Sequence, residues 1–386
     1  MDFDLNETQK LFQRSARELF SQECPSVLVR ETTEKDVPHA QNLWEHLVEQ
    51  GWTGLIFPEE LGGLGLGMVE MAVAFEEMGR ALVPGPYIST VPFAGSLLLK
   101  AGSRGALEYL RAIADGTVKA TVALLEEDAT WDVDSAAMPA AEAEHGVALS
   151  GRKLFVPDAA GADIIITAAR SRAGLVLAAV RLGAPGVKIN PMPSVDSLRP
   201  LYEVVFEAVA VSRDDILAEG KTAAAALTAS IDVATLALTA EMLGGMQWIL
   251  DATVEYAKTR KQFGKPIGQF QAVQHHCANM LLMTESTRSA VYYAAWIAGN
   301  EPALAPLAIS MAKTYASDCY REVGNLGIQV HGGIGFTWDH EIHFYYKRAK
   351  ASELMFGDAL YHRERIARIV MDGVGQSSLA SARAGD

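Results

Sequence analysis

The sequence predicts an α+β protein in which helices form both ends of the chain and strands form the middle. Apolar residues recur at helical spacing up to about residue 115. Short apolar runs bounded by Gly, Pro, Asp and Ser then occupy 116–215, and helical spacing returns from 216 onward. Because helices and strands are segregated along the chain instead of alternating, this order argues against a βαβ dinucleotide-binding fold.

The first segment, 1–115, is expected to form a helical domain. Stripes of apolar residues at helical spacing begin at Leu5 and at Leu43, and another amphipathic helix is predicted at about 68–82. A glycine-rich loop, 58–67, separates these helices. A dinucleotide-binding glycine loop follows a strand, whereas this loop follows a helical stretch, so we interpret it as a connection.

The middle segment, 116–215, is expected to form a small β domain. Apolar runs of strand length lie at 121–125, 164–168, 175–180 and 204–211. Clusters of Gly, Pro and Asp separate these runs, which is typical of short strands joined by turns.

The last segment, 216–386, predicts a helical bundle, because several long helical patterns follow one another. Its most apolar stretch, about 222–250, contains Asp232 and Glu241. An apolar stretch interrupted by two acids is typical of a buried helix and not of a membrane span.

The composition argues against several classes of partner. The 386 residues include 47 acids and 33 bases, which gives a net charge of −14, and 49% of them are hydrophobic. A protein this acidic repels phosphate backbones and anionic lipids, so we expect neither a nucleic acid nor a membrane as partner. The three cysteines lack metal-ligand spacing and no signal peptide is visible, so we expect no metal site and a cytoplasmic protein.

Two stretches of the last segment contain residues suited to an anionic or aromatic ligand. The first, 256–271, is the most basic part of this acidic chain and contains Arg260 and Phe263. A guanidinium can bind a phosphate through two N–H groups, and an aromatic side chain offers a flat face to a ring. Composition alone would favour a solvated basic turn at this place.

The second stretch, 329–336, reads Q-V-H-G-G-I-G-F and follows a predicted helix. Glycines allow a backbone to approach a ligand closely. Taken alone, the stretch is better explained as a helix C-cap followed by a turn.

Together, in this order and about 70 residues apart, the two stretches resemble the acyl-CoA dehydrogenase family. The loop 58–67, the F-E-E-M-G-R run at 75–80 and the helix–strand–helix order extend the resemblance to nearly the whole chain. The resemblance implies an N-terminal helical domain over 1–115, a β-barrel-like middle domain over 116–215 and a C-terminal four-helix bundle over 216–386. It also implies a tetramer.

In that family FAD lies across a subunit interface. The resemblance implies that Arg260 meets the pyrophosphate of a neighbouring subunit's FAD and that Phe263 packs near its adenine side. Further contacts to that FAD are implied for Gln262, Gln271, Gln329, Gly332 and Gly333.

The residues that would hold the chain's own flavin match the family badly. The family's T-E-x-x-x-G-S-D-like run corresponds to 125–132, which lacks that pattern. The family's W-I-T corresponds to Phe155, Val156 and Pro157, and proline has neither a side-chain donor nor an N–H. We therefore expect this flavin contact to be lost.

The chemistry of the family also needs a base. α,β-Dehydrogenation of an acyl-CoA thioester transfers a hydride to the flavin, while a carboxylate within hydrogen-bond reach takes the α proton. The family's two glutamate positions correspond to Phe356 and Ala234, and neither is an acid. Asp358 is the candidate replacement, whereas Glu241 lies about 10 Å along the helix from Ala234 and is too distant.

One half-site is therefore expected to be kept and the other lost, which resembles the partner subunits of heterotetrameric α2β2 acyl-CoA dehydrogenases. Our first hypothesis is an acyl-CoA dehydrogenase subunit that completes a partner's FAD site. We expect it to act on a bulky or steroid-type acyl-CoA and to pass electrons to an electron-transfer flavoprotein. The second hypothesis is a self-sufficient homotetramer with Asp358 as base, and the third is a non-catalytic binding protein of this fold.

Overall fold

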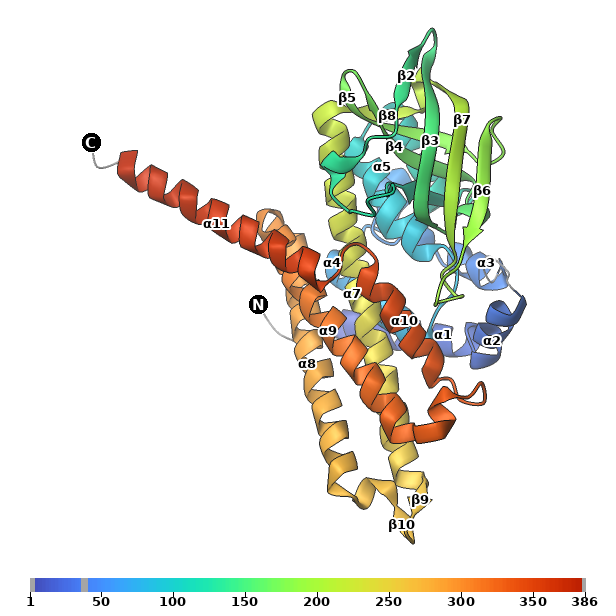
Figure 1. Ribbon diagram of the computed structural model, residues 1–386, viewed down its shortest axis with the longest axis vertical. Coiled ribbons are helices and arrows are strands. Elements are labelled where there is room, and N and C mark those ends of the chain that lie inside the picture. Colours follow the sequence, from blue (N-terminus) through green and yellow to red (C-terminus); the bar gives the residue numbers. More distant parts are fainter. Residues whose placement is uncertain (1–3, 36–40, 384–386) are drawn as a thin grey trace.

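The computed structural model describes residues 4–35 and 41–383, with side chains described over 4–34 and 41–371. In Figure 1 the β domain stands at the top, a bundle of long helices extends below it, and the N-terminal helices pack behind and beside both. This arrangement has the helical, β and helical parts that the sequence predicts.

The N-terminal part is helical. Its helices are α1 (Glu7–Glu23), α2 (Ser26–Lys35), α3 (Gln41–Glu49), α4 (Met68–Ala81), α5 (Ser96–Ala101) and α6 (Arg104–Ala114). The most buried of them is α4. A π-helical segment, Ser89–Gly95, leads into α5. A Cβ atom on Gly63 would lie 2.0 Å from the carbonyl oxygen of Phe57, so this glycine of the loop 58–67 is required by packing.

The β domain is built from two four-stranded sheets with the strand orders β1-β4-β5-β8 and β2-β3-β7-β6. Its strands are β1 (Ala120–Ala123), β2 (Ala140–Ala143), β3 (Gly146–Pro157), β4 (Ile164–Ser171), β5 (Gly174–Arg181), β6 (Val187–Met192), β7 (Leu201–Ser212) and β8 (Ile216–Glu219). Only β1 and β4 pair in parallel within these sheets. Apolar side chains such as Leu149, Ile165 and Phe206 fill the space between the sheets and give the domain its own core.

The C-terminal part is a helical bundle around α7. Its helices are α7 (Gly220–Thr259), α8 (Gln271–Asn300), α9 (Ala305–His331), α10 (Ile342–Leu354) and α11 (Ala359–Arg383). A short hairpin, β9 (Lys261–Gln262) and β10 (Lys265–Pro266), connects α7 to α8 at the lower tip in Figure 1.

The helix α7 holds the two helical parts together. It packs against α4 of the N-terminal part and against α8 and α9 of the bundle. It is long and apolar enough to cross a membrane, but 72% of its most apolar window is buried inside the protein. This burial is what a core helix requires, and it agrees with the interpretation of the stretch 222–250.

Candidate functional site

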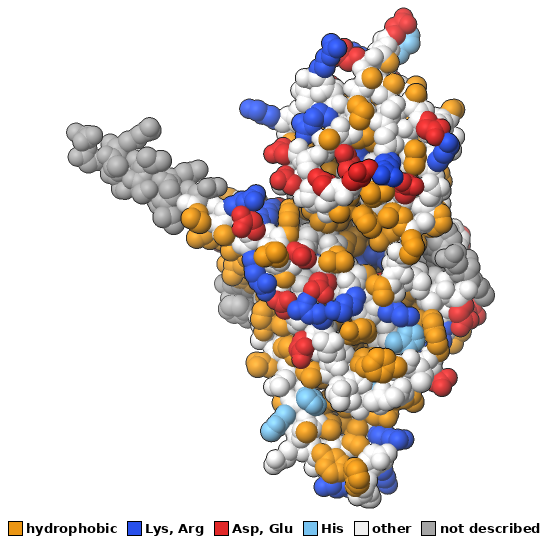
Figure 2. All heavy atoms as spheres, in the orientation of Figure 1, with side chains coloured by type: hydrophobic (Ala, Val, Ile, Leu, Met, Phe, Trp, Pro, Cys, Tyr) orange, Lys and Arg blue, Asp and Glu red, His pale blue; other side chains and the backbone are white. Residues whose placement is uncertain are grey.

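A cavity of about 590 Å³ lies where the β domain meets the helical bundle. Residues of the β domain such as Leu125, Phe155 and Pro157 form one wall, and residues around the α10–α11 connection form the other. The space-filling view shows hydrophobic side chains gathered between the β domain and the bundle (Figure 2). Most of the lining is apolar, so the cavity suits an apolar or aromatic ligand.

An aromatic cluster occupies the position that the family resemblance assigns to a catalytic glutamate. Phe356 is fully buried, and its ring centroid lies 5.0 Å from that of Phe93 and 5.0 Å from that of Trp131. The second glutamate position, Ala234, is also fully buried in α7. Neither position presents a carboxylate to the cavity, because neither residue is acidic.

Asp358 lines the cavity, as a candidate base must, but it also has a structural role. Its Oδ1 accepts a hydrogen bond of 2.8 Å from the backbone N–H of Tyr361 in the first turn of α11. This contact makes Asp358 the N-cap of that helix. The carboxylate is therefore held at the cavity wall by the helix that it caps.

Two parts of the wall contributed by the β domain differ from what a flavin site needs, namely the segment 155–157 and the stretch 125–132. Pro157 lines the cavity with no donor to offer, and the preceding Phe155 adopts a left-handed backbone conformation with φ +53°. In the stretch 125–132, Glu126 accepts hydrogen bonds from the ammonium of Lys153 at 2.6 Å and from the backbone N–H of Met138 at 2.9 Å. Oε1 of this carboxylate is therefore engaged within the chain.

Beneath the cavity lies a buried ion cluster that consists of Asp196, Arg199, Glu241 and Arg348. One guanidinium nitrogen of Arg199 lies 2.9 and 2.6 Å from the two carboxylate oxygens of Glu241. Arg348 bridges Glu241 and Asp196. Burial acts to raise the pKa of Glu241, but the two arginines outweigh it and hold that pKa below its usual value. Glu241 is therefore an ionised structural partner and not a base.

Asp158 follows Pro157 and lies close to this cluster. Its Oδ2 accepts a hydrogen bond of 2.6 Å from the hydroxyl of Ser89, and its buried Oδ1 has no partner among the described residues. Burial raises the pKa of Asp158 to about 6, although Ser89, Arg199 and Arg348 oppose the shift. The carboxyl group is thus the least satisfied acid near the cavity.

The basic stretch lies at the opposite end of α7, at the lower tip of the bundle. Arg260 and Gln262 are exposed, and Phe263, at the turn of the hairpin, is 91% exposed with φ +52°. Gln271 is the exposed first residue of α8. Figure 2 shows hydrophobic and basic side chains together at this tip. A large aromatic residue held in solvent by a strained turn indicates a surface that another molecule covers.

The glycine-rich stretch forms the end of α9 and the turn after it. Gln329 is exposed in the last turn of α9, and Gly332 has φ +64°. A Cβ atom on Gly332 or Gly333 would meet no atom of the described chain within 4 Å. Packing within this chain therefore gives no reason for glycine at 333, which suits close approach by a different molecule.

The structure brings these two stretches together and keeps them apart from the cavity. The rings of Tyr256 in α7 and His331 in α9 stack with centroids 4.5 Å apart, which joins the two stretches at the tip. Arg260 lies 26 residues beyond Ala234 along α7, about 39 Å at the helical rise. One chain cannot bring the tip and the cavity to the same reacting centre.

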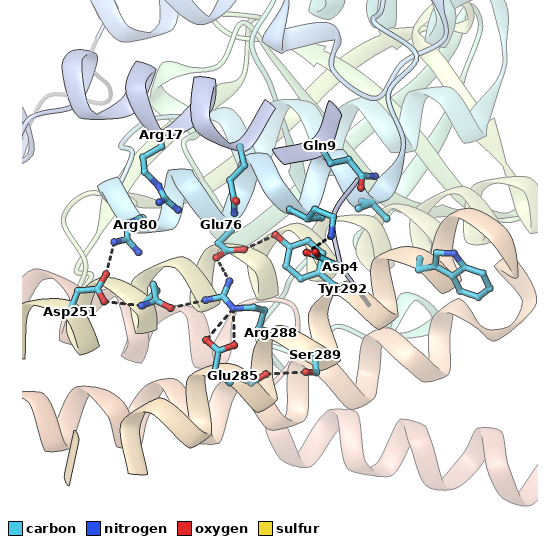
Figure 3. Close-up of a pocket in the computed structure, with 15 residues that line it drawn as sticks. Asp4, Gln9, Arg17, Glu76, Arg80, Asp251, Glu285, Arg288, Ser289 and Tyr292 are labelled. Carbon is cyan, nitrogen blue, oxygen red and sulfur yellow. Dashed lines mark hydrogen bonds and ion pairs between the residues drawn. The ribbon is translucent and has the colours of Figure 1, made fainter. Parts of the chain in front are cut away.

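A second cavity, of about 630 Å³, lies between α1, α4, α7 and α8. Several of its charged groups pair with one another (Figure 3). Glu76 accepts hydrogen bonds from Tyr292 and Arg288, and Asp251 binds Arg80. Since Glu76 and Asp251 are engaged by these partners within the chain, we do not assign the active site to this cavity.

Solved structures share this three-part fold. The Tcur3481-Tcur3483 steroid ACAD has a TM-score of 0.86 and 29% identity, over 96% of this chain and 99% of that chain. The ChsE4-ChsE5 complex from Mycobacterium tuberculosis has a TM-score of 0.86 and 27% identity, over the same shares. The chain thus has the fold of the acyl-CoA dehydrogenase class of oxidoreductases.

Sequence comparison identifies the family. Family models for the N-terminal and the C-terminal domain of acyl-CoA dehydrogenase match residues 6–117 and 223–371. The acyl-CoA dehydrogenase IpdE2 of Mycolicibacterium smegmatis is 30% identical over 366 residues, which covers 95% of this chain and 98% of the relative. The chain belongs to the acyl-CoA dehydrogenase family, and the family implies FAD as cofactor.

Sequence reasoning did not find the ion cluster or the stack at the tip. Glu241 is visible in the sequence as an acid in an apolar helix, but its partners Arg199 and Arg348 are 42 and 107 residues away. An acid inside an apolar helix signals a buried partner without saying which residue it is.

Proposed function

We propose that this chain is a subunit of a FAD-linked α2β2 acyl-CoA dehydrogenase and that it completes the FAD site of its partner subunit. The observation that carries the proposal is the contrast between the two ends of α7. The tip presents Arg260, the exposed Phe263, and Gly333, for which packing within the chain gives no reason to be glycine. The cavity lacks the flavin donor at Pro157 and a glutamate at Phe356.

In this proposal the tip binds and orients the cofactor. Arg260 donates to the pyrophosphate, and Phe263 covers the adenine side. Gln262, Gln271 and Gln329 add hydrogen bonds, and the backbone at Gly332 and Gly333 approaches closely. FAD held there would supply the acceptor for the hydride that leaves the β carbon of the acyl thioester. The partner subunit supplies the base that takes the α proton.

The relatives support the assembly and the substrate class. Two solved neighbours are described as the ChsE4-ChsE5 complex and as a steroid ACAD, and they are precedents for a second subunit and for a bulky acyl-CoA substrate. The family also implies an electron-transfer flavoprotein as acceptor of the electrons.

Bound FAD per chain tests the proposal directly. We expect FAD near zero in the chain expressed alone, and about half a FAD per chain after co-expression with the partner, since only one of the two kinds of site holds cofactor. Arg260→Ala should weaken FAD binding in the complex by about tenfold or more, because a charged phosphate contact is lost. Lys258→Ala is the matched control, since Lys258 is a neighbouring exposed cation paired with Glu255. One FAD per chain in the isolated protein would contradict the proposal.

A self-sufficient enzyme is the second candidate, and one observation favours it: Asp358 lines the cavity. Asp358→Asn keeps a residue that can cap α11 and removes the base. If the chain alone holds FAD and oxidises an acyl-CoA, loss of that activity in Asp358→Asn supports this candidate, and unchanged activity rejects it. Absence of FAD both with and without a partner would favour the third hypothesis, a non-catalytic binding protein.

A further inference from the structure

We infer that a stack of three rings, Tyr256, His331 and His340, holds the two stretches of the tip at a fixed spacing, and that His331 is a positioning residue for the cofactor site. This inference rests on the proposed function, which assigns both stretches to a partner's FAD. It adds a residue that contacts neither the cavity nor, in the proposal, the cofactor.

The rings connect three different elements. The centroids of Tyr256 and His331 lie 4.5 Å apart with 22° between the ring planes, and those of His331 and His340 lie 4.4 Å apart at 60°. Tyr256 precedes Arg260 by one helical turn in α7, and His331 is the last residue of α9, directly before Gly332. His340 precedes α10. Movement of one stretch against the other would break the stack.

Hydrogen bonds assign the protons of both histidines. His331 Nδ1 lies 2.8 Å from the carbonyl oxygen of Gly327, which can only accept, so Nδ1 carries the proton. Its Nε2 is buried without a partner among the described residues. His340 Nδ1 accepts a hydrogen bond of 3.1 Å from the backbone N–H of Ile342, so that nitrogen carries no proton. The stack therefore consists of neutral rings.

The surroundings keep both rings neutral near pH 7. Burial lowers the pKa of His331, the Gly327 carbonyl raises it, and His340 lowers it further. Burial also lowers the pKa of His340, while Glu341 raises it and Arg30 lowers it.

The next ionisable groups are on α10. Burial, together with Lys347, Arg30 and His340, lowers the pKa of His343 to about 4. A proton added to His331 would therefore place a charge in the stack with no anion beside the ring. A proton added to His340 would set a donor against the N–H of Ile342. Acid is thus expected to loosen the stack.

Hydrogen exchange of the chain alone tests the coupling without a partner or cofactor. The amides of 260–267 and of 332–341 are followed at pH 8 by mass spectrometry. We expect His331→Ala to speed exchange about tenfold in both stretches, and His331→Phe, which keeps a ring, to leave it within about twofold. His145→Ala is the control, since the His145 side chain is 88% exposed on the β domain. Faster exchange in 332–341 alone would overturn the inference.

The acid response supplies a readout that a purely structural role would not move. After correction for intrinsic exchange, the unsubstituted protein should lose protection in both stretches as the pH falls below about 6.5, because the pKa of His331 lies below that ordinary value. His331→Phe cannot be protonated at this ring and should lose less protection than the unsubstituted protein, the remaining loss being due to His340. Equal loss in both proteins would overturn the inference.

FAD retained by the complex with the partner separates the inference from the proposed function. We expect about tenfold weaker FAD binding for His331→Ala and near-normal binding for His331→Phe. If Arg260→Ala leaves FAD binding unchanged, the proposed function is wrong. If Arg260→Ala weakens FAD binding and His331→Ala does not, only the positioning role is wrong.

Discussion

Asp158 is a buried carboxyl group whose pKa links the stability of the fold to pH. Its pKa of about 6 in the folded protein lies above the value of about 3.9 in an unfolded chain. The folded state therefore binds the proton more tightly. The stability contributed by the protonated form is complete below about pH 4 and is lost as the pH rises through about 6.

Above about pH 6 the folded protein must hold Asp158 as a buried, charged carboxylate, which lowers its stability. Asp158→Asn should remove this cost, because an amide has nearly the same shape and no charge. We expect the free energy of unfolding to increase by about 1–2 kcal/mol at pH 8 and by less at pH 4.5, measured by urea unfolding. The exposed Asp214→Asn is the control and should change stability by less than about 0.5 kcal/mol. An equal gain at both pH values would contradict this assignment.

The buried ion cluster makes Arg348 critical for stability. Arg348→Met leaves Asp196 and Glu241 buried without the cation that they share. We expect a loss of about 3–5 kcal/mol in the free energy of unfolding. Arg152→Met removes a half-exposed arginine from its pairs with Glu127 and Glu203 and should cost less than about 1 kcal/mol. Similar losses in the two variants would show that burial does not distinguish these ion pairs.

At the scale of elements, the end of α10 depends on Lys313 in α9. The fully buried Lys313 ammonium donates to the carbonyl oxygens of Ser352 at 3.0 Å, Glu353 at 3.1 Å and Gly357 at 2.8 Å. These bonds satisfy the last carbonyls of α10 and hold the turn that carries Phe356. The cavity wall is thus fixed by a lysine that lies outside it.

Lys313→Met should leave these three carbonyls without their donor. We expect a loss of about 1–3 kcal/mol in the free energy of unfolding, together with faster hydrogen exchange at the α10–α11 connection. Lys350→Met, which alters a partly exposed lysine of α10 at the cavity wall, is the matched control and should be within about 0.5 kcal/mol of the unsubstituted protein. Unchanged exchange at the connection would reject this role for Lys313.

Apolar runs in the sequence predicted some of the strands and missed others. The runs at 121–125, 164–168, 175–180 and 204–211 correspond to β1, β4, β5 and β7. β3 was not predicted, because Gly151 and the charged residues after it interrupt its apolar pattern. It forms because β2 and β7 pair with it on both sides. Pairing of that kind depends on neighbours that are distant in sequence.

At the scale of the whole molecule, the bundle leaves large apolar side chains in solvent. Leu281 and Leu282 on α8 are 51% and 66% exposed, and Met311 and Tyr315 on α9 are 51% and 39% exposed. Apolar side chains on adjacent helices indicate a surface that another subunit covers.

Leu282→Lys should therefore reduce assembly. We expect light scattering to show a smaller mass for this variant at the same protein concentration, because a charged group would be buried at the interface. Leu11→Lys, which alters an equally exposed leucine of α1, should keep the original mass. An unchanged mass for Leu282→Lys would place the subunit interface elsewhere.

The sequence by itself determined the order of helical, β and helical parts, the two motif stretches, and the absence of glutamate at Phe356 and Ala234. These features depend on spacing and residue type along the chain, so they can be recognised locally. Tertiary structure decided that Phe356 packs between Phe93 and Trp131 and that His331 stacks on Tyr256. Such contacts join residues that are distant in sequence. They depend on how whole elements pack against one another, and no local pattern encodes that packing.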